Sequence, residues 1–280
     1  MRLVVTGAEG GLGRAFLAQL PEHHDVHPFG HATLDVGDHD AVMQLVPPLH
    51  PDAIFNLAAF TGVDANESDP VRAIRDNAAG PQSLALAARE CGAALVHIST
   101  DYVFDGSKPD PYDELDRPAP LSVYGRAKLA GEEHVRTLTP EHLIVRVGHV
   151  FGGGADYLTS AAHALRSGEP VGGIQDRVGT PTFVHDISER LLPLLLSRRW
   201  GTYHLAGTDV CSWFDVMTRL KEIGGLAGDV TPQRAGDLGL LAPRPANAAL
   251  SSVYLAGIGV DPMPPLDDAL ERFLATAAPG

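Results

Sequence analysis

The sequence predicts an α/β fold, with a doubly wound parallel sheet and a smaller C-terminal lobe. Short apolar segments rich in β-branched residues alternate with segments of helical periodicity through the first 150 residues. A glycine-rich turn lies between the first strand candidate and the first helix candidate. The chain has 280 residues, 44% of them apolar, so it can bury a large core as one domain or as two unequal domains.

The first half of the chain contains five strand candidates and four helix candidates. The strands are expected near Val4, Val26, Ile54, Val96 and Val145. The helices are expected at 11–20, 39–46, 71–91 and 122–136. In such a sheet, ligands bind in the crevice outside the carboxyl ends of the strands. Small or polar residues fall at four of these ends, at 6–7, 56–59, 99–100 and 148–149.

The alternation loosens after about residue 150. Three consecutive glycines at 152–154 predict a turn. Helices are expected at 186–197, 213–223 and 266–275, and a strand is expected at 203–205. No internal repeat or low-complexity tract is present.

The first glycine turn has the sequence context of a dinucleotide site, because it joins a buried strand candidate to a helix candidate. Gly7 allows the tight turn, Gly10 lets the backbone approach a pyrophosphate, and Gly13 permits close packing of helix on strand. The free N–H groups at the start of the helix then face the anion. The spacing is G-x-x-G-x-x-G rather than G-x-G-x-x-G, and glycines also serve ordinary loops.

Tyr124 and Lys128 are the strongest catalytic candidates. Four residues apart on a helix, their side chains emerge on one face and can meet a common ligand. A phenol has an ordinary pKa of about 10, and a neighbouring cation stabilises the phenolate. We therefore expect Lys128 to lower the pKa of Tyr124, which suits the phenol to proton exchange with a carbonyl oxygen. Thr100, at the end of a strand, can place its hydroxyl in the same network. The alternative is a pair of surface residues at a common spacing.

These motifs resemble the extended short-chain dehydrogenase/reductase family and, within it, the dTDP-4-dehydrorhamnose reductases. The matching segments are NLAAFTGVD at 56–64, STDYVFDG at 99–106, YGRAKLAGE at 124–132, DRVGTPT at 176–182, GTYHL at 201–205 and RPAN at 244–247. The likeness therefore covers nearly the whole chain. It implies a Rossmann-type NAD(P)-binding domain at 1–150. It also implies a mainly substrate-binding lobe at 151–280, with segments that return to the main domain.

The resemblance also implies roles for individual residues. The catalytic set would be Thr100, Tyr124 and Lys128. Besides Tyr124 and Lys128, the cofactor would be bound by Gly7, Glu9, Gly10, Gly11, Leu12, Gly13, Asp35, Val36, Leu57, Ala58, Ala59 and Thr61. The substrate would be bound by Val63, Asp101, Tyr102, His149, Arg244 and Asn247.

Three segments differ from patterns found in members of the family. Family members that dehydrate a sugar nucleotide carry Glu where this chain has Tyr102, so a dehydratase is disfavoured. The reductases usually follow Arg-Pro-x-Asn with Ser and a basic residue, whereas this chain has Ala248 and Ala249. They commonly place Trp at the position of His149. The last two differences concern the substrate side, and they put the identity of the sugar in doubt.

The cofactor is expected to be NADPH, with NADH as the alternative. NAD-selective enzymes usually carry an acidic residue after the second strand, which accepts the ribose hydroxyls. The segment 26–31 contains no carboxylate, and Asp35 comes later. A 2′-phosphate should then be tolerated, with His31 or Arg14 as candidate partners.

Charge and composition restrict the partners. A formal net charge of −14 argues against a nucleic-acid or anionic-membrane surface. The longest apolar cluster, at 191–196, is too short to span a bilayer, and the chain begins directly with a strand candidate. We expect a cytoplasmic protein that is compatible with a homodimer. No metal is expected, because the histidines at 23, 24, 27 and 31 straddle a helix end without a common face.

The sequence thus predicts an NAD(P)H-dependent reductase of a nucleotide-activated 4-keto-6-deoxyhexose, with dTDP as the expected nucleotide. One alternative is a nucleotide-sugar epimerase that retains NAD. Another is a non-catalytic regulatory subunit that resembles the regulatory partner of a methionine adenosyltransferase. The complete set of Thr100, Tyr124 and Lys128 argues against the non-catalytic alternative.

Overall fold

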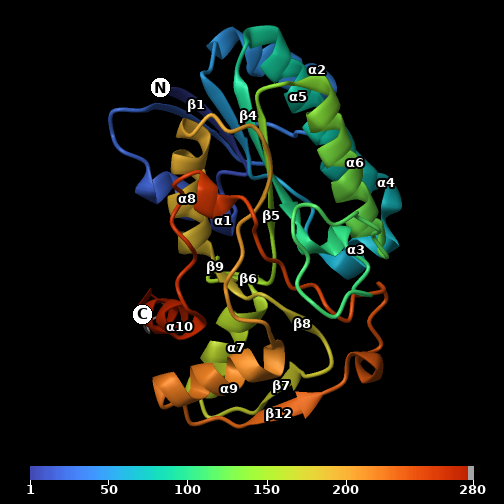
Figure 1. The fold of residues 1–280 in the computed structure, drawn as a ribbon, viewed down its shortest axis with the longest axis vertical. Helices are drawn as coiled ribbons and strands as arrows, with labels where there is room; N and C mark the ends of the chain where they lie inside the picture. The colour runs from blue at the N-terminus through green and yellow to red at the C-terminus, as the bar shows by residue number, and fades with distance from the viewer. Residues whose placement is uncertain (277–280) are drawn as a thin grey trace.

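A six-stranded, all-parallel sheet forms the centre of the computed structural model, which describes residues 1–276 (Figure 1). Its strands are β1 (Arg2–Thr6), β2 (Asp25–Phe29), β3 (Ala53–Asn56), β4 (Ala94–Thr100), β5 (His142–Val147) and β10 (Gly201–His204). Their spatial order is β10-β5-β4-β3-β1-β2. The order reverses between β1 and β3, and such a switch point leaves a ligand crevice at the carboxyl ends. The five strands expected in the first half are confirmed, as is the doubly wound fold.

Burial explains the composition of these strands. β3 is buried along its whole length, and β1, β4 and β5 are nearly so, as expected of parallel strands covered on both faces. β2 is more exposed and contains Pro28, which lacks a backbone donor. Its place at the edge of the sheet tolerates that proline.

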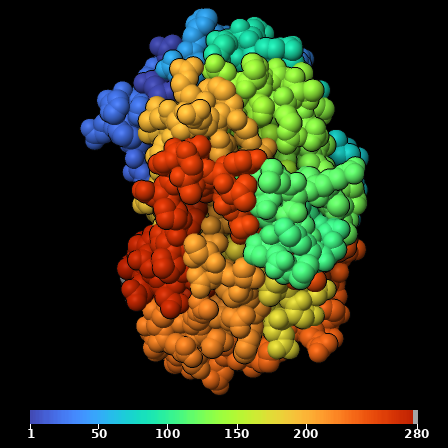
Figure 2. Space-filling model, in the orientation of Figure 1, coloured from blue at the N-terminus to red at the C-terminus, as the bar shows by residue number. Residues whose placement is uncertain are grey.

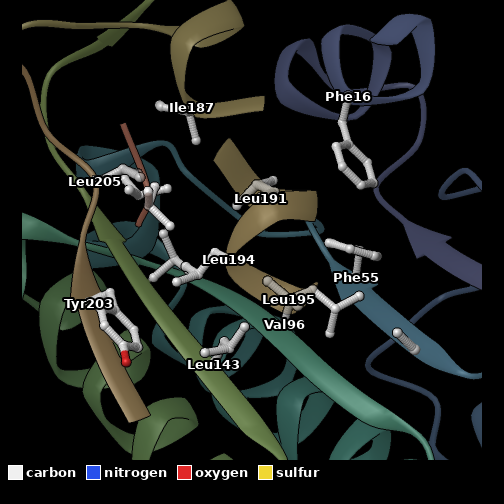
Figure 3. Close-up of a cluster of buried hydrophobic side chains, with 14 of the residues drawn as sticks. Phe16, Phe55, Val96, Leu143, Ile187, Leu191, Leu194, Leu195, Tyr203 and Leu205 are labelled. Atoms are coloured by element: carbon white, nitrogen blue, oxygen red, sulfur yellow. The ribbon is translucent and has the colours of Figure 1, made fainter. Parts of the chain in front are cut away.

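Helices cover both faces of the sheet (Figure 1). One face carries α2 (His39–Leu45), α5 (Gly80–Cys91) and α6 (Val123–Leu138), and the other carries α1 (Gly11–Gln19) and α8 (Val184–Leu196). The core beneath α8 contains Leu191, Leu194 and Leu195, which lie against Phe55 and Val96 of the sheet (Figure 3). The second half of the chain therefore completes the core of the first half.

The helix expected at 71–91 is interrupted. It consists of α4 (Pro70–Ile74), a π-helical turn (Arg75–Ala79) and α5. Pro81 has no N–H to donate to the carbonyl of Asn77, which explains the local change of helix type. Gly131 of α6 packs against that carbonyl, and a Cβ there would lie 2.4 Å from the oxygen.

A smaller lobe lies at the lower end of the molecule (Figures 1 and 2). They include α7 (Tyr157–Arg166), α9 (Trp213–Gly224) and α10 (Leu266–Thr276), with the parallel pair β7 (Val171–Ile174) and β12 (Val230–Gln233). Short pairs connect the lobe to the sheet: β6 (Val150–Phe151) with β9 (Thr182–Phe183), and β8 (Val178–Gly179) with β11 (Cys211–Ser212). A separate apolar core includes Phe151, Phe183 and Phe273.

Two helices were not expected from the sequence. α3 (Val63–Ser68) is a short helix after β3. α7 is capped by Asp156, whose side chain accepts from the Thr159 N–H, and it buries Leu158 and Leu165. The capping residue and the apolar spacing of α7 are both present in the sequence. The helix was missed because they follow closely after the glycines at 152–154, which predict a turn.

We predicted an NAD(P)-binding domain at 1–150 and a mainly substrate-binding lobe at 151–280. That division of binding roles remains a prediction. The later segments α8 and β10 do belong to the main sheet and its helical layer. Residues 277–280 of the predicted lobe lie outside the described residues. Within residues 1–276, no helix combines the length and apolarity needed to cross a membrane.

Candidate active site

A cavity of about 710 Å³ lies between the carboxyl edge of the sheet and the smaller lobe. The sheet side contributes residues of the glycine turn, of the segments after β3 and β4, and of α6. The lobe side contributes Gly153 and residues 155–157, and the start of α8 contributes Val184. Of the residues predicted to act in catalysis or binding, the cavity is lined by Glu9, Gly10, Gly11, Leu12, Leu57, Ala58, Ala59, Thr61, Val63, Thr100, Asp101, Tyr102, Tyr124, Lys128 and His149.

The glycine turn has the geometry expected of it. Gly7 adopts a left-handed conformation with φ of +68°, and a Cβ there would lie 2.6 Å from the Ala58 nitrogen. A Cβ on Gly13 would lie 2.2 Å from the Gly7 carbonyl oxygen, so only glycine lets α1 start so close to β1. Gly10 is exposed and has no side-chain cap, which leaves the N-terminus of α1 open to the cavity.

A second cavity of about 390 Å³ extends from the glycine turn toward β2. Asp35 and Val36 line it, together with His31. Arg14 does not line it, because its guanidinium donates to the carbonyls of Glu9 and Gly153. The suggestion that Arg14 contacts a 2′-phosphate is therefore not supported by its position.

Glu9 changes the argument about cofactor choice. A Cβ on Gly30, directly after β2, would lie 2.2 Å from Glu9 Cδ, so the Glu9 carboxyl group covers that position. The sequence has no carboxylate after β2, but the fold places one there from the glycine turn. Arg72, which lines this cavity, is paired with Asp76 at 3.1 Å, and the lining residue Asp35 is paired with Arg75 at 3.3 Å.

Thr100, Tyr124 and Lys128 meet at the buried end of the larger cavity, with exposures of 5%, 8% and 1%. Thr100 is the last residue of β4 and caps a 3₁₀ turn, η3 (Asp101–Val103). Tyr124 lies in the first turn of α6, which packs so closely on η3 that a Cβ on Gly125 would lie 2.1 Å from the Tyr102 carbonyl oxygen. Tyr124 is also hydrogen-bonded to Thr100.

The electrostatics of Tyr124 and Lys128 differ from the prediction. Burial raises the pKa of Tyr124 above its ordinary value, and the hydrogen bond with Thr100 opposes that rise only in part. Burial also lowers the pKa of Lys128 to about 8. The Lys128 ammonium donates to the Ile98 carbonyl at 2.6 Å rather than to the phenol. The predicted lowering of the Tyr124 pKa by Lys128 is thus wrong for this structure, because burial dominates.

Asp101, Tyr102 and His149 surround the catalytic group on the substrate side. Thr100 Oγ1 donates to Asp101 Oδ1 at 2.8 Å, and His149 Nδ1 lies 3.4 Å from Asp101 Oδ2. The Tyr102 and Tyr124 rings meet edge to face at 5.8 Å. Burial raises the pKa of Tyr102 to about 12.

Arg244 and Asn247 do not line the larger cavity. The guanidinium of Arg244 donates to both carboxylate oxygens of Asp64, at 3.0 and 2.9 Å. The side chain of Asn247 donates to the carbonyls of three residues at 108–110 and holds that loop. Asp64, next to Val63 on α3, was not predicted as a site residue, and it pairs with the Arg244 guanidinium that was expected to bind the substrate.

The histidines at 23, 24, 27 and 31 are not gathered around a common point. The His23 and His24 rings are tilted by 41° with their centroids 4.2 Å apart, whereas His27 Nε2 lies 3.3 Å from Asp25 Oδ1. Within residues 1–276, no group of three or more His, Cys, Asp or Glu side chains is arranged to hold a metal ion.

Comparison with known proteins relates this site to a family. Residues 1–278 match the family model described as the RmlD substrate binding domain. A dTDP-4-dehydrorhamnose reductase of Mycobacterium tuberculosis is 37% identical over 99% of this chain and 93% of the relative. A probable dTDP-4,6-dihydroxy-2-methyloxan-3-one 4-ketoreductase of Streptomyces antibioticus is 33% identical, over 94% and 91% of the two chains. A crystal structure of a dTDP-4-dehydrorhamnose reductase from Bacillus anthracis, in complex with NADP, superimposes with a TM-score of 0.95 at 34% identity, over 98% of this chain and 99% of that one.

Proposed function

Because this chain belongs to the RmlD substrate-binding domain family, we propose that it reduces the 4-keto group of a dTDP-linked 4-keto-6-deoxyhexose with NAD(P)H. The observation that carries this proposal is the buried group of Thr100, Tyr124 and Lys128 at the end of a cavity that begins at the glycine turn. The relatives named as reductases of dTDP-linked keto sugars support the substrate class.

The residues around the glycine turn fit a dinucleotide. Gly7 and Gly13 shape the turn, and the backbone at Gly10 is open to both cavities. Asp35 and Val36 would adjoin the adenosine half, and Leu57, Ala58 and Ala59 line both cavities. We propose NADPH as the reductant, with NADH as the alternative, and the Bacillus anthracis structure in complex with NADP supports this choice. When bound, the reduced nicotinamide supplies the hydride for the keto carbon.

The side chains of the site supply the proton that the keto oxygen takes up when the keto carbon is reduced. The raised pKa of Tyr124 keeps its phenol protonated at neutral pH, so Tyr124 Oη can donate to the keto oxygen as negative charge develops there. Thr100, hydrogen-bonded to Tyr124, orients that oxygen. Lys128 lines the cavity and donates to the Ile98 carbonyl, and we propose that its ammonium would also bind the nicotinamide ribose of the cofactor.

The proposed sugar contacts are Val63, Asp101, Tyr102 and His149, which line the cavity beside Tyr124. The Arg244 guanidinium does not line the cavity. We therefore propose that Arg244 acts through its neighbours, by pairing with Asp64 beside Tyr102. Asn247 is proposed to shape the substrate side through the loop it holds.

We also propose a cytoplasmic location, where reduced dinucleotides are supplied, and a homodimer that analytical ultracentrifugation would reveal.

The test is NADPH oxidation by the purified protein against a panel of dTDP-4-keto sugars, with NMR of the products. Consumption of NADPH with formation of a 4-hydroxy product is expected. An epimerase would instead purify with tightly bound NAD, visible in its absorption spectrum, and would interconvert sugars without added reductant. A protein that neither oxidised NADPH nor changed any sugar would contradict the proposal and favour a regulatory subunit.

A further inference from the structure

A fully buried carboxylate lies one helical turn after the catalytic lysine. Glu132 of α6 is 0% exposed. Its side chain lies on the same helix face as that of Lys128, because residues four apart are neighbours on a helix. A glutamate is almost never fully buried without a partner, since removing its charge from water costs several kcal/mol. Glu132 is therefore expected to have strong partners.

Donors from two neighbouring strands converge on this carboxylate. Arg146 of β5 donates to both oxygens, from Nε to Oε1 at 2.9 Å and from Nη2 to Oε2 at 2.7 Å. Ser99 of β4 donates from Oγ to Oε1 at 2.5 Å. In each of these bonds the carboxyl group accepts, which is the pattern of an ionised carboxylate. Because Ser99 precedes Thr100, Glu132 ties the end of β4 to the helix that carries the other two catalytic side chains.

Arg146 is itself fixed by its surroundings. It is 3% exposed, its guanidinium carbon lies 5.2 Å from the centroid of the Phe104 ring, and Nη1 lies 3.4 Å from His204 Nε2. His204 Nδ1 faces the carbonyls of Tyr112 and Ser251, which assigns the proton to that nitrogen and leaves Nε2 to accept. Burial also lowers the pKa of His204. The ion pair is thus held from both sides and shielded from water.

The charge of Lys128 depends on this carboxylate. Burial lowers the pKa of the ammonium to about 8, and the negative charge of Glu132 opposes that fall. Lys128 Nζ donates to the carbonyl of Ile98, the residue before Ser99. The same short stretch of β4 therefore receives a bond from the lysine and gives one to the glutamate.

The surrounding groups leave Glu132 as the carboxylate that acts on Lys128. His97 of β4 adds no charge, because burial lowers its pKa well below the ordinary value. Arg136 of α6 lies 3.6 Å from Glu132 but also donates to Glu133. Among the described residues, the other charged or titratable groups of the elements around this part of α6 are Tyr124 of α6, Asp101 and Tyr102 of η3, Glu67 of α3, which accepts from the Val123 N–H, and Asp76 of the π-helical turn, which pairs with Arg72 and Arg75.

We propose that Glu132 is a positioning residue of the active site, whose carboxylate keeps the Lys128 ammonium charged where burial favours the neutral amine. This inference rests on the proposed reductase function. Arg146 keeps the carboxylate ionised, and the carboxylate in turn keeps the lysine ionised. A charged Lys128 is then available to the nicotinamide ribose. The bond from Ser99 to Glu132 holds the end of β4 in place beside it.

A direct test follows the titration of Lys128. The chain contains three lysines, at 108, 128 and 221, so NMR of protein labelled at lysine Cε can follow each one, and Lys128→Met identifies the signal of interest. In the wild type this signal should titrate near pH 8. In the double variant Glu132→Gln/Arg146→Gln the midpoint should fall by about one pH unit or more. Removal of both partners avoids an unpaired buried arginine.

The control is Asp186→Asn/Arg272→Gln. Asp186 is also buried and accepts from Arg272 at both oxygens, but this pair belongs to the smaller lobe. The control should lower stability and leave the Lys128 midpoint unchanged. An unchanged midpoint in the Glu132/Arg146 variant, or equal shifts in both variants, would overturn the inference. A wild-type midpoint near 10.5 would also overturn it, even if the variants did not fold, because the lysine would then need no carboxylate.

A second readout separates positioning from mere structural support. Lys128 is charged below its pKa, so the alkaline limb of the pH profile of kcat/KM for NADPH should move to lower pH in the Glu132/Arg146 variant. The loss relative to the wild type should then grow from pH 6 to pH 8. A loss that is equal at every pH would contradict the proposed role. If the wild type oxidised no NADPH with any keto sugar, the proposed function would fail, whereas the lysine titration would still decide whether Glu132 sets the charge of Lys128.

Discussion

The two cavities that meet at the glycine turn differ in the burial of their charged and titratable residues. We assign catalysis to the buried end of the larger cavity and the choice between NADPH and NADH to the exposed rim of the second one. At the catalytic end, Tyr124 and Lys128 are almost fully buried, and burial shifts the pKa of both. At the other end, Arg72 and Arg75 are nearly half exposed and lie in ion pairs with aspartates. Exposed pairs of this kind contribute at most about 1 kcal/mol. Substitutions at the buried end should therefore have large effects on turnover or stability, and those at the exposed end should have small effects on cofactor preference.

The largest effect is expected at Tyr124. Tyr124→Phe removes the proton donor but keeps the ring, so turnover should fall by about 100-fold or more. Binding of NADPH, followed by fluorescence, should persist. Tyr254→Phe, at a half-exposed residue that does not line the cavity, serves as the matched control. Turnover of Tyr124→Phe within threefold of the wild type would refute the assignment.

Lys128 should make stability depend on pH. Its pKa is about 8 in the folded protein and about 10.5 when unfolded. Below pH 8 the lysine is charged in both states, and burial of that charge destabilises the fold. As the pH rises from 8 to 10.5 only the unfolded state stays protonated, so the destabilisation fades.

Lys128→Met should remove this dependence. The shift corresponds to about 3 kcal/mol, reduced to about 2 kcal/mol by the lost hydrogen bond to Ile98. Urea unfolding at pH 7 should therefore show the variant to be more stable but inactive, with its advantage over the wild type shrinking between pH 8 and 10.5. A difference in unfolding free energy that is constant with pH would contradict the burial argument.

His149 should influence which sugar is preferred. An indole offers a broader apolar wall than an imidazole, so His149→Trp should change the relative kcat/KM among 4-keto sugars by about tenfold, or about 1.4 kcal/mol. Because a Cβ on Gly179 would lie 2.0 Å from the present ring, the larger side chain must project farther into the cavity. Unchanged ratios in a folded variant would show that His149 does not contact the sugar.

The smallest effect is expected at Glu9. We expect the wild type to use NADPH at least as well as NADH, despite the Glu9 carboxyl group at Gly30. Glu9→Gln removes the charge that would repel a 2′-phosphate, so the kcat/KM ratio of NADPH to NADH should rise by about threefold to tenfold, within about 1.4 kcal/mol. Glu22→Gln, on the exposed segment after α1, is the control. A ratio that falls, or a strong NADH preference in the wild type, would contradict the prediction.

The sequence by itself determined the features that depend on local spacing. The strand–turn–helix at Gly7–Gly13 follows from period and glycine placement, because both act within one or two turns of chain. Tyr124 and Lys128 share a helix face for the same reason, and Thr100 lies at a strand end because an apolar run stops there. The doubly wound sheet follows from alternation of these local units.

Only the tertiary structure decided which distant groups meet. Arg244 pairs with Asp64, 180 residues away, instead of facing the cavity. Glu9 covers the position after β2 that lacks a carboxylate in the sequence, and His149 meets Asp101 across two strand ends. The pKa of Tyr124 also depends on the fold, since burial of the phenol raises it. Periodicity predicts the face on which a side chain emerges, but packing and burial select its partner and its charge.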